Sequence, residues 1–294
     1  MAAALGRYRA RERAIVSEWT PEKALAEMEK NGVATGILSI TTPGIWFGDV
    51  QAARVLSRKC NEYGAQLVRD HPGRFGFFAT APLPDTEGSL REIAYALDVL
   101  KADGIGLMTS YGDKWPGDPA YASVFNELNR RKAVVYFHPT AADCCRDLMP
   151  EVPAPLIEYP HDTTRAITSL LYSGSFAQFR DIRFIFSHAG GTMPMLAGRI
   201  SQLGTLFGSD KKVPAGVEHE LKKLYYEIAN SANRSTMAAL MALVPTSQIL
   251  FGSDNPFVPT GVTATGMKTL GLSASDLQAI ERDNALTLLP RFKS

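Results

Sequence analysis

Cysteine is scarce in this chain, which carries 3 cysteines among 294 residues. No two of them show the C-x-x-C spacing common in metal and redox sites, and an odd count without regular spacing argues against a disulfide framework. Cys144 and Cys145 are sequence neighbours, which we expect to be free thiols in a loop. This use of cysteine indicates a reducing compartment, and we expect a cytoplasmic protein.

Long apolar runs and an excess of one charge are lacking too. No window approaches the roughly 18 uninterrupted apolar residues of a membrane-spanning helix, and the N-terminus lacks the positive-then-apolar order of a secretory signal. The net charge is +1 and there is no long basic run, so we expect neither a membrane nor a nucleic acid as partner. A content of 45% apolar and 21% charged residues is typical of a soluble enzyme, and we expect its partner to be a small molecule.

Nucleotide-binding glycine motifs are absent as well, since neither G-x-G-x-x-G nor G-x-x-x-x-G-K-[ST] follows a predicted strand. The chain instead alternates apolar runs typical of buried strands with amphipathic helical segments. Seven strands are predicted, near residues 33, 74, 104, 133, 182, 224 and 248. Because there is no internal repeat, low-complexity tract or linker, residues 1–294 are predicted to form one α/β domain.

A closed (β/α)8 TIM barrel needs eight strands, and the missing one would precede the first predicted helix. We therefore expect a TIM barrel whose first strand is lacking or truncated, and an open doubly wound sheet is the structural alternative. Three helix starts are also predicted from capping residues. Thr20 opens the first helix, Asp162 opens a helix after an irregular loop over 140–160, and Ser273 with Asp276 opens the last helix.

Three predicted strands carry a metal-binding or proton-transferring side chain at their carboxyl ends. His138 ends the run at 133–138, His188 follows the run at 182–186, and Asp254 follows the run at 249–251. In a β/α barrel these strand ends converge, so separate strands can build one site. An ordinary structural hydrogen bond is the alternative for each histidine taken alone.

Three aromatic residues, Trp46, Tyr111 and Phe257, also follow predicted strand ends. They are placed to bind the two faces of an aromatic ring. Packing of the loops is the alternative explanation for all three.

Several short motifs, taken in their order along the chain, resemble one family. They are Trp19-Thr20-Pro21, His138-Pro139, Asp162-Thr163-Thr164-Arg165, Ser187-His188-Ala189-Gly190-Gly191 with Pro194 and Arg199, Gly252-Ser253-Asp254-Asn255-Pro256-Phe257, and Asn284-Ala285. The set resembles the second amidohydrolase family, metal-dependent TIM barrels that include decarboxylases of aminocarboxymuconate semialdehyde, γ-resorcylate and 6-methylsalicylate. The likeness spans nearly the whole chain, and the segment around His188 most resembles the 6-methylsalicylate decarboxylase kind.

The resemblance implies a divalent metal, zinc first and manganese second, with His138 and Asp254 among its ligands. It implies that His188 handles protons beside the metal, that Asp254 shares this catalytic role, and that Arg199 reaches across a homodimer interface to the substrate carboxylate. An exposed helix arginine is the alternative for Arg199. The implied substrate is a small aromatic or unsaturated carboxylic acid, which would be decarboxylated without an oxidant.

The sequence departs from the family in one respect, because the H-x-H metal pair of the family's first strand is absent. The H-x-H pair would lie on the strand that is predicted to be missing, so the two absences have the same cause. We expect that the chain begins downstream of the true start, or that it descends from a member that lost the strand. A catalytic zinc usually needs three protein ligands, so two alternatives to decarboxylation stay open. One is a metal-dependent hydrolase, lactonase or hydratase, and the other is an inactive barrel that acts as a binding or assembly protein.

Overall fold

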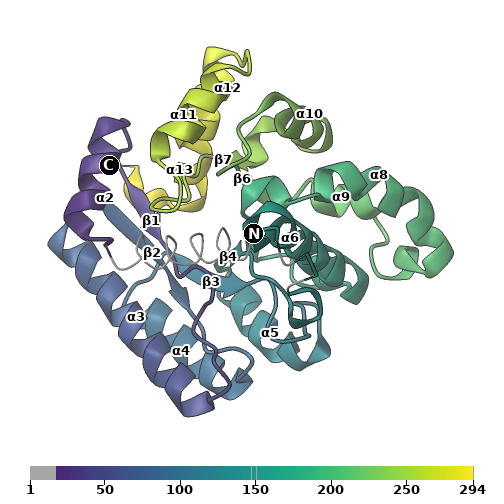
Figure 1. Ribbon diagram of the computed structural model, residues 1–294. Helices are drawn as coiled ribbons and strands as arrows, with labels where there is room; N and C mark the ends of the chain where they lie inside the picture. The colour runs from purple at the N-terminus through teal and green to yellow at the C-terminus, as the bar shows by residue number, and fades with distance from the viewer. Residues whose placement is uncertain (1–17, 147, 150, 294) are drawn as a thin grey trace.

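The computed structural model describes residues 18–146, 148–149 and 151–293. Its centre is a sheet of seven strands in the order β1-β2-β3-β4-β5-β6-β7, and each strand is parallel to its neighbours. The strands are β1 Gly36–Leu38, β2 Phe75–Thr80, β3 Gly104–Met108, β4 Val134–His138, β5 Arg183–Phe186, β6 Tyr225–Glu227 and β7 Ile249–Leu250. The sheet curls, and the helices lie around its outside (Figure 1).

The seven predicted strands are confirmed, and each lies in the predicted segment. Spatial order follows chain order throughout, as in a TIM barrel, whereas a doubly wound sheet reverses its order at the first strand. Among the described residues no further strand joins β7 to β1, so the barrel wall is open at the position predicted for the missing strand.

Two of the three predicted helix starts are confirmed. Thr20 accepts a hydrogen bond from the backbone N–H of Lys23, and Ser273 accepts one from Asp276, as predicted. The helices are α2 Pro21–Lys30, α3 Val50–Asp70, α4 Thr86–Asp98, α5 Ala122–Arg130, α6 Ala154–Ser173, α7 Ser175–Gln178, α8 Met193–Gly204, α9 Val217–Leu221, α10 Arg234–Leu243, α11 Thr260–Lys268, α12 Ala274–Gln278 and α13 Asn284–Leu288. None of the helices in the described part of the chain is both long enough and apolar enough to cross a membrane.

Two sequence predictions about the segment after β4 are wrong. Asp162 does not cap a helix: α6 already begins at Ala154, inside the segment predicted as loop, and Asp162 lies in its interior with its side chain fully buried. Cys144 and Cys145 are joined as a disulfide between neighbours and are not free thiols, whereas Cys60 is free. The first error arose because Pro160, which usually ends or begins a helix, lies inside this one.

Apolar side chains pack against both faces of the sheet. On its outer side, side chains such as Phe137 and Phe186, whose ring centroids are 4.8 Å apart, pack under the helices. On its inner side, Phe78, Val134 and Leu289 belong to a second cluster that fills the barrel.

The C-terminal segment covers the end of the barrel where the strands begin. There Arg291, in the short helix η8 Pro290–Phe292, donates a hydrogen bond of 2.7 Å to Asp103, which precedes β3. The other end, where the strands finish, is therefore left for a site.

A cluster of charges ties α4 to α5. Arg131 donates hydrogen bonds of 2.7 and 2.8 Å to Asp98 at the end of α4, and one of 2.5 Å to Glu127 in α5. Hydrogen bonds from Arg130 and Arg131 lower the pKa of Glu127 from 4.5 to about 2. A carboxyl group with a lowered folded-state pKa stabilises the fold above its unfolded pKa, and this contribution is lost as the pH falls through the folded value.

We predict that Glu127→Gln lowers the free energy of unfolding at pH 7 by about 1 kcal/mol. The deficit should shrink as the pH falls from 4.5 towards 2, where wild-type Glu127 is itself protonated. Urea unfolding curves recorded from pH 7 to pH 3 measure this, with Glu29→Gln at an exposed position of α2 as control. A deficit that does not change with pH would show that packing, and not charge, is the cause.

Candidate active site

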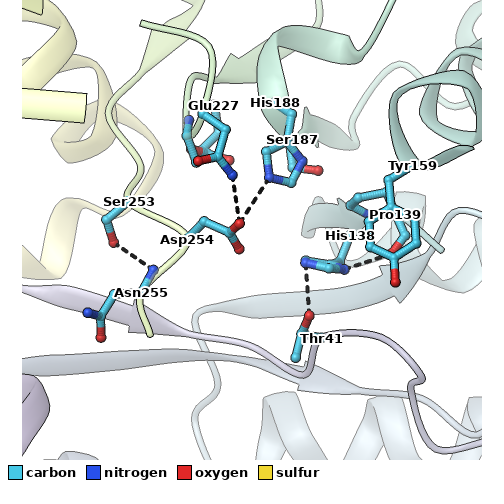
Figure 2. Close-up of polar contacts among 12 residues, drawn as sticks. Thr41, His138, Pro139, Tyr159, Ser187, His188, Glu227, Ser253, Asp254 and Asn255 are labelled. Atoms are coloured by element: carbon cyan, nitrogen blue, oxygen red, sulfur yellow. Dashed lines mark hydrogen bonds and ion pairs between the residues drawn. The ribbon is translucent and has the colours of Figure 1, made fainter. Parts of the chain in front are cut away.

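The three chemically active residues at the strand ends lie together. His138 ends β4, His188 begins the short helix η3 His188–Gly190 after β5, and Asp254 follows β7. The Nε2 atom of His188 lies 3.6 Å from Oδ2 of Asp254, and the ring centroids of His138 and His188 are 6.1 Å apart. Figure 2 shows all three side chains facing one space. The structure thus brings together the residues whose convergence the sequence predicted.

The hydrogen bonds of His138 determine which of its nitrogens carries a lone pair. Nδ1 lies 2.9 Å from the carbonyl oxygen of Pro139, which can only accept, so Nδ1 must carry the proton. Nε2 then has the lone pair, which accepts a hydrogen bond of 3.1 Å from the hydroxyl of Thr41. Burial, with a further contribution from His188, lowers the pKa of His138 to about 4. His138 is therefore a neutral imidazole whose lone pair faces the site.

His188 and Asp254 form a charged pair. Burial acts against charge on both groups, but the contact between them outweighs it, so the pKa of His188 is raised and that of Asp254 is lowered. The side-chain amide of Asn230 donates a hydrogen bond of 2.7 Å to the Oδ2 atom of Asp254. The pair can hold a proton beside any molecule bound in the site.

Glu227 is a site residue that the sequence reasoning missed. It ends β6, its carboxylate accepts a hydrogen bond from the backbone N–H of Ala229, and it lies close enough to His188 to interact with it electrostatically. Burial raises its pKa. The available signal was a carboxylate inside an otherwise apolar predicted strand, LYYEIA at 224–229.

Left-handed backbone conformations concentrate at the strand ends. His188 (φ 53°), Ala189 (φ 57°), Asn230 (φ 57°) and Asp254 (φ 58°) adopt a region that side chains other than glycine rarely occupy. Each such residue costs of the order of 1 kcal/mol and persists only where its surroundings hold it. Glu227 supplies part of this restraint, because its carboxylate binds the backbone N–H of Ala229, next to Asn230. Such strain is typical of functional sites.

The four predicted substrate-binding residues lie in three different places. Trp46 and Tyr111 both line a cavity of about 40 Å³ beside the site, between the loops that follow β1, β3 and β4, and Arg146 lies at the same cavity. The phenol oxygen of Tyr111 accepts a hydrogen bond from the backbone N–H of Met108. Phe257 is half-buried in the loop after Asp254, and Arg199 is exposed on α8.

The described residues offer two donors for a divalent cation, the Nε2 lone pair of His138 and the carboxylate of Asp254. A neutral imidazole and a carboxylate are suitable ligands for zinc and manganese. No group of three or more His, Cys, Asp or Glu side chains that could hold one metal ion occurs in the part of the chain that the structure describes. The pair fits a cation that takes its other ligands from water or substrate oxygens.

Gly252 leaves the space that the Glu227 side chain occupies. A Cβ atom at Gly252 would lie 1.7 Å from Oε1, 2.1 Å from Cδ and 2.5 Å from Cγ of Glu227, so rotating the carboxylate alone would not relieve the clash. We predict that Gly252→Ala lowers the free energy of unfolding by about 1–3 kcal/mol, in the range for overpacking. In contrast, Gly198→Ala, at an open position of α8, should raise it by about 1 kcal/mol. Chemical denaturation of both variants tests this, and equal effects would contradict it.

Comparison with known proteins identifies the family. Residues 17–291 match the model of a family described as Amidohydrolase. The 6-methylsalicylic acid decarboxylase acuB of Aspergillus aculeatus is 37% identical over 291 residues, which cover 95% of this chain and 88% of that protein. A crystal structure of an amidohydrolase II superposes with a TM-score of 0.87 at 28% identity, covering 93% of this chain and 89% of the other. A dihydroxybenzoic acid decarboxylase from Polaromonas sp. JS666, with bound manganese and the inhibitor 2-nitroresorcinol, has the same fold (TM-score 0.86, 21% identity, covering 94% and 87%). The chain therefore belongs to the second amidohydrolase family.

Proposed function

We propose that this enzyme is a metal-dependent decarboxylase of a phenolic carboxylic acid of the 6-methylsalicylate kind. The observation that carries the proposal is the placement of the His188–Asp254 pair beside the lone pair of His138, at the carboxyl ends of three strands. The 37% identity to a 6-methylsalicylic acid decarboxylase over 95% of the chain supports the reaction and the substrate class.

His138 and Asp254 would hold the cation, zinc or manganese. When bound there, it supplies a Lewis acid for the carboxylate and neighbouring oxygen of the substrate. The Nε2 atom of His138 is available for this role because its proton lies on Nδ1, so only the hydroxyl of Thr41 must give way. The two donors of the described chain leave room for substrate oxygens.

The His188–Asp254 pair would transfer the proton that decarboxylation requires. Protonation of the ring carbon that bears the carboxylate prepares the bond to that group for cleavage. Carbon dioxide then leaves, the bonding electron pair returns to the ring, and one proton has replaced one carboxyl group. His188 is held for this step by its contact with Asp254, and Asp254 is held by Asn230. Trp46 and Tyr111 would bind the ring from the neighbouring cavity, and Phe257 from the loop after Asp254.

A homodimer is part of the proposal. The large apolar side chains of Met195 in α8 and of Leu206 and Phe207 in η4 Thr205–Phe207 are 75%, 76% and 76% exposed, which is unusual for a surface in contact with water. Arg199 is exposed on the same helix. A second copy would cover these side chains and bring its Arg199 towards the substrate carboxylate. The cytoplasmic location expected from the sequence also remains a proposal.

We predict that the purified enzyme loaded with Mn²⁺ or Zn²⁺ releases carbon dioxide from 6-methylsalicylate or γ-resorcylate. His188→Gln should lower kcat by about 100-fold or more, because a general acid contributes about that much, while keeping the bound cation. His138→Ala and Asp254→Asn should lose both activity and cation, as measured by metal analysis. His219→Gln, at an exposed histidine of α9, is the matched control. Ring opening of a lactone panel without release of carbon dioxide would instead identify a hydrolase.

We also predict that the wild type elutes as a dimer and that Leu206→Glu with Phe207→Ser produces a monomer. Two charged or polar side chains in an apolar interface remove its burial energy. Light scattering coupled to size-exclusion chromatography measures the mass. A wild-type monomer at high concentration would refute the dimer without affecting the proposed reaction.

A further inference from the structure

Asp162 is a buried carboxylate with an unusual set of partners. It lies in α6 with its side chain fully buried, and it accepts hydrogen bonds from the hydroxyls of Thr109 and Ser110 and from the indole N–H of Trp115. The three distances are 2.5, 2.8 and 2.8 Å. All three donors belong to the loop that follows β3. A buried charge is costly unless its hydrogen bonds are satisfied, so this arrangement depends on all three donors.

The hydrogen bond between Thr109 and Asp162 is part of a chain of hydrogen bonds that reaches His138. Because Thr109 gives its hydroxyl hydrogen to Asp162, its oxygen is left to accept the backbone N–H of Thr140 at 3.0 Å. The backbone N–H of Thr109 donates to the carbonyl oxygen of His138, also at 3.0 Å. Two bonds from one residue thus hold the chain from 138 to 140, which contains the imidazole that faces the site.

A second contact fixes the same loop on α6. Ser169 lies two helical turns after Asp162, on the same face of the helix, and its hydroxyl accepts the backbone N–H of Gly117 at 3.0 Å. A Cβ atom at Gly117 would lie 2.2 Å from the carbonyl oxygen of Ser169, so the close approach requires glycine. Ser110 and Thr140, at either end of the network, line the cavity beside the site.

We propose that Asp162 is a positioning residue of the active site. Through Thr109 it sets the position of His138, and through Ser110 and Trp115 it sets the wall of the neighbouring cavity. Its side chain is fully buried, so it would act without touching the substrate. The proposal deepens the proposed function and rests on it for the catalytic readout only.

Asp162→Asn tests the proposal because the amide cannot satisfy all three donors. If its oxygen faces the two hydroxyls, its NH₂ group opposes the indole N–H of Trp115, which can only donate. If the amide is flipped, its NH₂ group faces the hydroxyls, and Thr109 must direct its hydrogen elsewhere. Asp162→Asn should lower the Mn²⁺ affinity and kcat/KM by about 10-fold each, as for the loss of an outer-shell partner. The indole N–H signal of Trp115 should shift in NMR spectra and exchange faster with solvent.

Trp115→Phe provides the rescue, because it removes the opposing N–H. In the double variant the asparagine oxygen can accept from Thr109 and Ser110 without a clash, so Mn²⁺ affinity and kcat/KM should recover towards the values of Trp115→Phe alone. Asp118→Asn is the matched control: it makes the same change in the same loop, where Asp118 caps η1 Pro119–Tyr121 and an amide oxygen can still accept from Ala120.

Two results would overturn the proposal. The first is an Asp162→Asn variant that keeps the wild-type Mn²⁺ affinity and an unshifted Trp115 signal. The second is a double variant that is as impaired as Asp162→Asn, because the clash between the asparagine NH₂ group and the indole N–H of Trp115 would then not be the cause. Thermal unfolding of each variant separates loss of positioning from loss of the fold. If the wild type decarboxylates no acid, the proposed function fails, while the affinity and NMR measurements still test Asp162.

Discussion

The parallel direction of all seven strands is the constraint on which this structure depends. Because no strand reverses, every strand finishes at the same end of the barrel, and the side chain that follows each one is delivered there. His138, His188 and Asp254 are far apart in the sequence and meet for this reason. The other end is closed by the C-terminal segment through Arg291 and Asp103. One end of the barrel therefore carries the site, and the other end serves the fold.

The chemistry of the site follows from the contacts that hold its backbone. His188 and Asp254 adopt left-handed conformations that cost free energy, and they also carry the opposite charges of the pair. Glu227 binds the backbone N–H of Ala229 through its carboxylate, and its position beside His188 is possible only because Gly252 has no side chain. The backbone strain at His188 and Asp254, the charges of this pair and the close packing of Glu227 on Gly252 therefore depend on one another, and a change in one affects the others.

A second arrangement of the same kind lies on the opposite side of His138. There the buried carboxylate of Asp162 accepts hydrogen bonds from neutral donors in the loop after β3. One of these donors, Thr109, also binds the backbone that follows His138 and so helps to position His138. The two sides differ in chemistry, since one holds a charged pair and the other holds a neutral imidazole whose lone pair faces the site. This difference would let His138 hold a cation together with Asp254 while His188 moves a proton.

Much of the fold and part of the site could be predicted from the sequence. The continuous apolar runs that mark buried parallel strands are a local property, and so is the residue that ends each run, which is why the strands and the residues His138, His188 and Asp254 were identifiable. Asp162 was misassigned as a helix cap because an aspartate near a proline has the same local pattern in both roles. Glu227 is not predicted as a site residue because only the fold places its buried carboxylate beside His188 and Gly252.

The sequence by itself therefore determined the order of elements, the parallel sheet and the identity of the residues at the strand ends, because each depends on neighbours in the chain. Only the tertiary structure decided which nitrogen of His138 faces the site, which residues adopt left-handed conformations, and which buried carboxylate binds which loop. The nitrogen of His138 that faces the site is set by contacts with the adjacent Pro139 carbonyl and with Thr41, which is 97 residues away. The buried carboxylate is set by contacts such as Thr109 with Asp162, at a separation of 53, and no local sequence pattern records these contacts.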